Sequence, residues 1–189
     1  MKSEQVAHKV HPVKSYRDAL ELMRLIPDFP KEGILFQDIT PILSDGEAFT
    51  AIIREIVSRS SSVNYVAGVE ARGFIFAAAV AHELGVGFIP IRKKGKLPHD
   101  SISRSYGLEY GHAELEIHRD AIPEGSKVLL IDDILATGGT IGAAIELVHE
   151  LRATVTDVAF ISEIPELNGT LLMRERYPAI KIHILSNPR

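Results

Sequence analysis

The sequence predicts an α/β fold in which helices flank a central, mostly parallel sheet. Short, almost continuously apolar runs are typical of strands that are buried on both faces. Segments with helical periodicity separate several of these runs, as they do in βαβ units. The chain of 189 residues shows no internal repeat or low-complexity tract, and this length fits one domain.

The amino-terminal part of the chain predicts two helices around an irregular segment. Ser15 can cap the first helix, with Asp18 at the capping-box position, and Pro27 ends it. Residues 28–46 are rich in Pro, Gly and Asp and are expected to be irregular. The second helix is predicted over residues 48–57. The apolar face of the first helix consists of Ala19, Leu22, Met23 and Ile26.

The rest of the chain alternates between predicted strands and helices. Helices are expected over residues 73–84, where Gly85 follows as a stop signal, and over residues 140–151. A β-hairpin laid over the sheet is expected around Tyr110 and Gly111. The first 14 residues lack periodicity and predict a flexible tail. The predicted strands of the sheet cover residues 63–69, 86–91, 127–131, 155–161 and 180–185.

Composition and charge exclude several classes of protein. The chain is 46% hydrophobic and 24% charged, unlike disordered, collagenous or coiled-coil proteins. A net charge of −4 is unfavourable for general nucleic-acid binding, which needs surplus basic side chains. The absence of cysteine excludes disulfides, thiolate metal sites and cysteine nucleophiles. With no secretory signal and no apolar stretch long enough to span a bilayer, we expect a cytoplasmic protein that binds neither nucleic acid nor membrane.

The strongest functional pattern is the segment VLLIDDILATGGT, residues 128–140. An apolar strand leads into Asp132 and Asp133, and a glycine-containing loop then opens a helix. Such a loop presents free N–H groups and a favourable dipole to a phosphate, while paired carboxylates can accept hydrogen bonds from a vicinal diol. The P-loop and Rossmann glycine patterns are absent. The segment therefore predicts a site for a phosphate and a ribose together.

Two further groups of residues suit a polyphosphate. The segment Glu70-Ala71-Arg72-Gly73 lies at another predicted junction between a strand and a helix. The one basic cluster of the chain follows the next predicted strand, and it could neutralise several phosphate charges. A solvated surface remains the alternative for this cluster taken by itself. Its members are Arg92, Lys93, Lys94 and Lys96.

These segments resemble a known enzyme family. Residues 128–140 resemble the 5-phosphoribosyl-1-pyrophosphate (PRPP) motif of type I phosphoribosyltransferases. Four flanking segments are similar to those of the adenine phosphoribosyltransferases, and the resemblance runs in the right order from about Pro27 to Gly169. The flanking segments are FPKEGILFQDITPIL (29–43), GVEARGFIF (68–76), IRKKGKLP (91–98) and YGLEYGHAELEIHRDAI (106–122).

The resemblance implies a fold and a reaction. It implies the type I phosphoribosyltransferase fold as a single domain over residues 15–189, with a small hood at about 15–45 and a hairpin lid at about 93–112. It implies a pentosyltransferase, a kind of glycosyltransferase, that makes AMP and pyrophosphate from adenine and PRPP in purine salvage. Mg²⁺ as cofactor and a homodimer, with Arg92 reaching the partner's site, are implied as well.

The resemblance also assigns roles to individual residues. Glu109 in the lid is the candidate proton acceptor, Tyr110 lies on the substrate, and Arg72 acts in catalysis and pyrophosphate binding. Asp132 and Asp133 hold the ribose hydroxyls directly or through Mg²⁺-bound water, so no direct protein ligand of the metal is assigned. The 5′-phosphate is assigned to Ala136, Thr137, Gly138, Gly139 and Thr140. Pyrophosphate is assigned to Glu70, Ala71, Arg72, Arg92, Lys93 and Lys96. Adenine is assigned to Leu35, Phe36, Gln37 and Ile164.

Alternatives and departures from the family pattern stay open. A transferase for hypoxanthine, guanine or xanthine is one alternative, although no lysine stands near residues 161–167 to meet a purine oxygen. A non-catalytic regulator that binds PRPP is another, although the chain offers no DNA-binding segment. Gln37 stands where the family usually has Arg, and Arg152-Ala153 stands where Gly-Gly is common. The segment 163–169 is only partly similar to the family.

Overall fold

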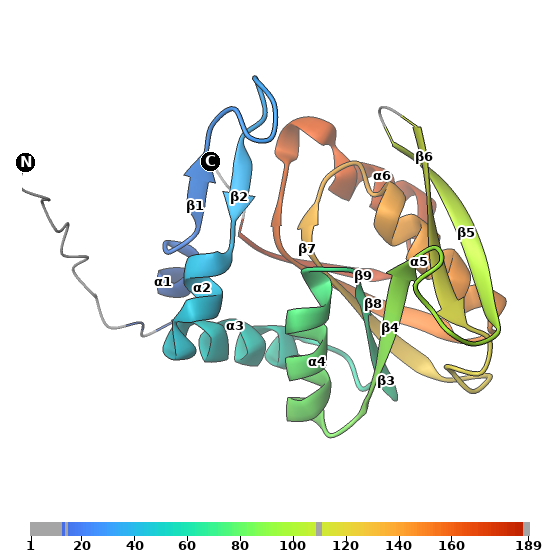
Figure 1. Ribbon diagram of the computed structural model, residues 1–189. Coiled ribbons are helices and arrows are strands. Elements are labelled where there is room, and N and C mark those ends of the chain that lie inside the picture. Colours follow the sequence, from blue (N-terminus) through green and yellow to red (C-terminus); the bar gives the residue numbers. More distant parts are fainter. Residues whose placement is uncertain (1–12, 14, 109–110, 187–189) are drawn as a thin grey trace, which may run out of the picture. The chain divides into compact units, whose positions relative to one another are not determined.

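The computed structural model describes residues 13, 15–108 and 111–186, and the chain divides into two compact units, residues 1–52 and 53–189 (Figure 1). Most of the predicted tail, residues 1–14, lies outside the described residues. The helix α3 (Gly46–Arg59) runs across the division between the units. None of the helices in the described part of the chain has the length and apolar character needed to cross a membrane.

The first unit holds two short helices and a two-stranded sheet. Its elements are α1 (Tyr16–Leu20), β1 (Arg24–Ile26), β2 (Phe36–Asp38) and α2 (Thr40–Ser44). The hydroxyl of Ser15 accepts a hydrogen bond from the N–H of Asp18 at 3.3 Å, which confirms the predicted cap. The strands β1 and β2 are antiparallel, and an ion pair of 2.7 Å joins Arg24 to Asp38 across them.

Two predictions for this unit were wrong. The first helix ends at Leu20 and does not continue to Ile26, because the backbone of residues 24–26 pairs with β2 instead. The segment 28–46 was expected to be irregular, but it contains β2 and α2. For the first helix, the pairing of β1 with β2 overrides the local helical periodicity.

The second unit is built on a seven-stranded sheet in the order β5-β6-β4-β3-β7-β8-β9. The strands β4, β3, β7, β8 and β9 are parallel neighbours, as predicted. Helix α4 (Gly73–Leu84) ends at Gly85, which adopts a left-handed conformation with φ of 67°. The strands are β3 (Tyr65–Val69), β4 (Gly87–Lys93), β5 (Ser101–Leu108), β6 (Gly111–His118), β7 (Lys127–Leu135), β8 (Thr154–Glu163) and β9 (Lys181–Ser186).

Helices α4 and α5 (Gly139–Glu150) cover opposite faces of this sheet (Figure 1). Ala67 of β3 and Leu130 of β7 share a buried cluster with α5. Gly68, the residue after Ala67 in β3, faces α4, because a Cβ at this position would lie 2.7 Å from the Cβ of Ala77. Successive strand residues point to opposite faces, so the continuous apolar strands are buried on both sides.

The hairpin of β5 and β6 was expected to lie over the sheet. In the structure it extends the sheet instead. Strand β6 pairs antiparallel with β4, with Arg92 opposite Glu116 and Lys93 opposite Leu115. This pairing engages the backbone at the carboxyl end of β4. After α5, Arg152 takes the left-handed conformation that glycine usually provides, with φ of 58°, at a cost of about 1 kcal/mol.

The 3₁₀ turn η1 (Pro165–Leu167) and the helix α6 (Gly169–Arg176) were not predicted. Helix α6 is short and carries both exposed leucines and charged residues, so no continuous apolar face indicates it. Leu171 and Leu172 are about half exposed, at 56% and 48%, while Met173 is buried. The apolar periodicity is therefore broken within one turn.

A buried acidic residue stabilises the amino half of β8. Asp157 is fully buried, and its Oδ1 lies 2.9 Å from Nε2 of His183 and accepts a 3.2 Å hydrogen bond from the hydroxyl of Ser61. Burial acts to raise the pKa of Asp157, but hydrogen bonds from His183, Thr156 and Ser61 outweigh it, so the pKa lies below its usual range. The ionised form is therefore the one that the fold favours.

Asp157→Asn is expected to reduce the free energy of unfolding at pH 7 by about 1–3 kcal/mol, because a charge-assisted hydrogen bond is lost. A carboxylate with a lowered pKa stabilises the fold above its unfolded pKa of about 3.9 and loses this effect as the pH falls further. Urea unfolding should therefore show a gap between variant and wild type at pH 7 that narrows below about pH 4. Asp100→Asn removes an exposed ion pair with Arg119 and serves as the control. A gap that is constant with pH would contradict the assignment.

Candidate functional site

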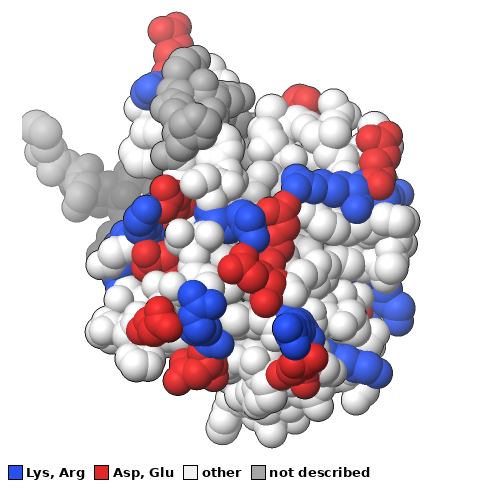
Figure 2. All heavy atoms as spheres, turned by 90° about the vertical axis from the view of Figure 1, so that its right-hand side faces the viewer, with Lys and Arg blue, Asp and Glu red and all other residues white. Residues whose placement is uncertain are grey.

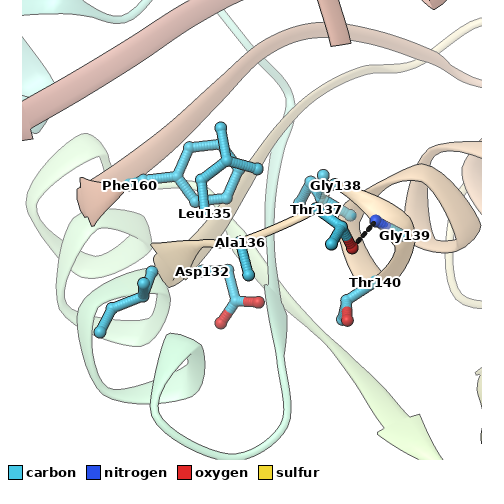
Figure 3. A pocket seen from close by; sticks show the side chains of 10 residues that line it. Asp132, Leu135, Ala136, Thr137, Gly138, Gly139, Thr140 and Phe160 are labelled. Carbon is cyan, nitrogen blue, oxygen red and sulfur yellow. Dashed lines mark hydrogen bonds between the residues drawn. The ribbon is translucent and has the colours of Figure 1, made fainter. Parts of the chain in front are cut away.

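The loop between β7 and α5 forms a small concave pocket. Gly138 takes a left-handed conformation with φ of 84°, which glycine adopts without strain. The hydroxyl of Thr137 accepts a hydrogen bond of 3.5 Å from the N–H of Gly139, the first residue of α5. Figure 3 shows this pocket, which has a volume of about 50 Å³. Its lining consists of Asp132, Ile134, Leu135, Phe160 and residues 136–141.

The pocket has the properties of a phosphate site. The N–H of Gly142 donates to the carbonyl of Gly138 at 2.9 Å, at the start of α5. The N–H groups of the residues before Gly142 have no acceptor within the helix. They lie at the positive end of the helix dipole, where an anion is favoured. The structure thus brings together all five residues predicted for the 5′-phosphate, Ala136 to Thr140 (Figure 3).

Asp132 and Asp133 form a tightly coupled acidic pair beside this loop. They were expected to follow the end of their strand, but β7 continues through them to Leu135. Oδ1 of Asp132 accepts a hydrogen bond of 2.9 Å from the N–H of Asp133. Burial raises the pKa of Asp132 well above its usual range, and the charge of Asp133 raises it further. Burial also raises the pKa of Asp133, although the charge of Arg72 opposes this effect.

An ion pair joins the acidic pair to the loop between β3 and α4. Nε of Arg72 lies 2.6 Å from Oδ2 of Asp133, whose side chain is only 8% exposed. The peptide bond between Glu70 and Ala71 in this loop is cis. At the start of α4, a Cβ on Gly73 would lie 2.7 Å from the carbonyl oxygen of Ile131 and 3.0 Å from Oδ1 of Asp132. Glycine at this position is therefore required for the close approach of the start of α4 to β7.

The basic cluster is folded around Glu70 of the same loop. The carboxylate of Glu70 lies 2.6 Å from Nζ of Lys96 and 3.3 Å from Nη2 of Arg92, and it accepts a hydrogen bond of 3.1 Å from the N–H of Lys93. Burial acts to raise the pKa of Glu70, but these partners lower it to about 2. Lys94 pairs instead with Glu114 of β6. Three side chains of the cluster, those of Arg92, Lys94 and Lys96, are thus paired with carboxylates.

Charges of both signs are interspersed on the face of the molecule shown in Figure 2, where Lys and Arg lie next to Asp and Glu. Within residues 13, 15–108 and 111–186, no three His, Cys, Asp or Glu side chains gather closely enough to hold a metal ion. The carboxylate of Asp132 lines the phosphate pocket and accepts a hydrogen bond from the N–H of its neighbour Asp133.

The residues predicted to bind a purine belong to different units. Leu35, at 52% exposure, Phe36 and Gln37 belong to the first unit, where the ring of Phe36 meets that of Phe29 edge to face at 5.1 Å. Ile164 belongs to the second unit, and its N–H donates to the carbonyl of Leu135 at 2.8 Å. Ile164 therefore lies next to the start of the phosphate loop.

Two predicted site residues, Glu109 and Tyr110, lie outside the described residues. The predicted lid, about 93–112, contains the turn after β4, the strand β5 and the start of β6. Sequence reasoning missed helix α6 as a neighbour of the phosphate loop, where Gly169 and Met173 face Ala136 and Gly138. In the sequence, the only indication of this contact was a glycine followed by a methionine at helical spacing, Gly169 and Met173.

Comparisons with known proteins agree with this geometry. The model of the phosphoribosyl transferase domain family matches residues 40–167. The adenine phosphoribosyltransferase of Bradyrhizobium sp. is 50% identical over 159 residues, which cover 83% of this chain and 89% of the relative. That of Halothermothrix orenii is 52% identical over 151 residues, covering 79% and 89%.

Solved structures are also similar. The adenine phosphoribosyltransferase of Thermoanaerobacter pseudethanolicus is 43% identical with a TM-score of 0.86, covering 92% of this chain and all of that one. The Saccharomyces cerevisiae enzyme, complexed with adenine and an imino-altritol bisphosphate, is 38% identical with a TM-score of 0.82, covering 90% and 98%. By sequence and by fold, the chain belongs to the phosphoribosyltransferase family, within its group of adenine phosphoribosyltransferases.

Proposed function

We propose that the protein transfers the 5-phosphoribosyl group from PRPP to N9 of adenine, giving AMP and pyrophosphate. The observation that carries this proposal is the ion pair between Arg72 and Asp133. This ion pair supports the proposal, because it joins a cation that we assign to pyrophosphate to a carboxylate that we assign to the ribose diol, and the neighbouring Asp132 lines the pocket that we assign to the 5′-phosphate. These are the three polar parts of PRPP, in the order that they have in the molecule.

In this mechanism the bond from C1′ to pyrophosphate breaks and the bond from C1′ to N9 forms. Arg72, Arg92, Lys93, Lys96 and the backbone at Ala71 bind the leaving pyrophosphate, and Asp132 and Asp133 hold the ribose hydroxyls near the developing positive charge. Glu109 accepts the N9 proton, and Tyr110 covers the substrate when the lid excludes water. Leu35, Phe36, Gln37 and Ile164 bind adenine in this proposal.

Mg²⁺ fits the residues of this site. The pKa values of Asp132 and Asp133 are raised by burial, so a nearby cation would favour their ionised forms. Few protein ligands suit an ion that keeps several waters and binds substrate phosphates. Asp132 and Asp133 would hold it through water, and it would neutralise charge on the pyrophosphate.

The proposal extends to the organisation of the chain. We propose a single transferase domain over residues 15–189 with a hood at about 15–45 and a lid at about 93–112, acting as a cytoplasmic homodimer. Arg92 pairs with Glu70 of its own chain, and we propose that it also reaches the partner's site. Sedimentation at working enzyme concentration measures the dimer, and a fully active monomer would contradict it.

The deciding assay follows AMP or pyrophosphate formation from PRPP and Mg²⁺ with adenine, hypoxanthine, guanine and xanthine in turn. We expect turnover with adenine. No turnover with adenine, or turnover only with a 6-oxopurine, would overturn the proposal.

Glu109→Gln is expected to lower kcat by a factor of about 10²–10⁴, the usual effect of a general base, with little change in the affinity for PRPP. Steady-state kinetics with varied PRPP separate the two parameters. Glu114→Gln is the control in the same hairpin, since Glu114 pairs with Lys94; its kcat should stay within about threefold of wild type. Near wild-type turnover of Glu109→Gln would remove Glu109 from the mechanism.

A further inference from the structure

Helix α6 lies against the back of the phosphate loop at a position where only glycine fits. Gly169 is the first residue of α6 and is buried. A Cβ added to Gly169 would fall directly on the carbonyl oxygen of Ala136 and 2.9 Å from Cγ of Leu135. Neither atom belongs to the end of a flexible side chain, so a larger residue could be accommodated only by moving the loop. Space, and not backbone freedom, therefore dictates glycine here.

A second contact lies one turn further along the same helix. A Cβ on Gly138 would be 3.2 Å from Cγ and 3.4 Å from Sδ of Met173, and Met173 is only 2% exposed. Residues four apart in a helix share one face, so Gly169 and Met173 form a single surface behind the loop. They back Ala136 and Gly138, two of the residues that surround the phosphate pocket.

Helix α6 is itself fixed at both ends. At its start, the hydroxyl of Thr170 donates to Oε2 of Glu163 at 2.6 Å, which anchors it to the end of β8. At its end, Arg176 pairs with Glu146 of α5, and the hydroxyl of Tyr177 lies 3.4 Å from the carbonyl oxygen of Gly142. These contacts link one end of the helix to β8 and the other end to α5.

We propose that Gly169 and Met173 are positioning residues that set the backbone of the phosphate loop from behind, and thereby determine its affinity for a 5′-phosphate. This inference rests on the proposed function for the identity of the ligand. Neither residue touches the ligand; both act through Ala136 and Gly138. The affinity for pyrophosphate, which we assign to Arg72 and the basic cluster, should not change when Gly169 or Met173 is substituted.

The test compares two ligands by calorimetry, ribose 5-phosphate for the loop and pyrophosphate for the opposite side of the site. Gly169→Ala is expected to weaken ribose 5-phosphate binding at least tenfold and to change pyrophosphate binding less than twofold. Gly46→Ala is the matched control, because Gly46 is likewise the first residue of a helix, α3, and its added Cβ would meet nothing within 4 Å; it should bind both ligands as wild type does. Enzyme kinetics should show a raised KM for PRPP with an unchanged KM for adenine.

Wild-type affinity of Gly169→Ala for ribose 5-phosphate would overturn the inference, and so would an equal loss of both ligands, which indicates general damage. If Gly169→Ala does not fold, Met173→Ala decides: at least threefold weaker ribose 5-phosphate binding with unchanged pyrophosphate binding supports the inference, and unchanged binding of both contradicts it. Because the binding assay needs no turnover, a failure of the adenine reaction would leave its result interpretable.

Discussion

Replacing Asp132 and Asp133 together by Asn is expected to abolish measurable PRPP binding. The two carboxylates lie beside the phosphate loop and are the acceptors that we assign to the ribose hydroxyls and to Mg²⁺-bound water. Hydrogen bonds to charged groups contribute about 1.5–3 kcal/mol each, so the loss of two predicts an affinity lower by a factor of 10² or more. Isothermal titration with PRPP and Mg²⁺ measures it, and an unchanged affinity would contradict the ribose assignment.

The single variant Asp132→Asn separates lost function from lost stability. The pKa of Asp132 is raised by burial and by the charge of Asp133, so the fold disfavours its ionised form at neutral pH. A neutral amide removes this cost, and the melting temperature of Asp132→Asn should therefore equal or exceed that of wild type. PRPP affinity should nevertheless fall at least tenfold. A lower melting temperature would indicate instead that the carboxylate stabilises the fold.

The pH dependence of binding follows from the same raised pKa. Below this pKa Asp132 is protonated, and it then offers fewer acceptors to the diol and no charge to Mg²⁺. PRPP binding to wild type should weaken as the pH falls through this region. This decrease in PRPP affinity with falling pH should be missing in Asp132→Asn, whose side chain does not titrate.

Much of the parallel sheet could be predicted from sequence because its signals are local. The run 73–84 is apolar up to His82 and Glu83 and is followed by Gly85, and the structure begins and ends α4 as predicted. The early end of α1, the strand at Arg24–Ile26 and the pairing of β6 with β4 depend on which distant backbone is available as a partner. No local pattern contains that information.

The site shows the same division between local and distant information. The loop residues 136–140 are contiguous, so their grouping followed from the sequence alone. The ion pair between Arg72 and Asp133 and the pairing of Glu70 with Lys96 join residues that lie far apart in the sequence. Glu70 was expected to bind pyrophosphate, yet its carboxylate holds the cations that we assign to that role. A carboxylate beside a predicted anion site can thus organise the cations of that site.

Arg72→Ala is expected to reduce kcat/KM for PRPP by a factor of about 10²–10³, the usual effect of losing one donor to a developing anion. Arg72→Lys keeps the charge but not the planar fork, so its loss should be intermediate. Arg72 also lowers the pKa of Asp133. In Arg72→Ala that pKa should rise, and the fall of kcat/KM at low pH should move to higher pH.

The measurement is kcat/KM for PRPP as a function of pH for wild type, Arg72→Ala and the control Arg119→Ala. The control removes an exposed ion pair with Asp100, and its kcat/KM should stay within about twofold of wild type. Because Arg72 and Asp133 are in direct contact, the losses of Arg72→Ala and Asp133→Asn should not add in the double variant. Additive losses would mean that each residue acts alone, and an unshifted pH profile would mean that Arg72 binds pyrophosphate without controlling the charge of Asp133. The pair is expected to behave as one unit, in which binding of pyrophosphate to Arg72 and of the ribose to Asp133 are coupled through a single contact.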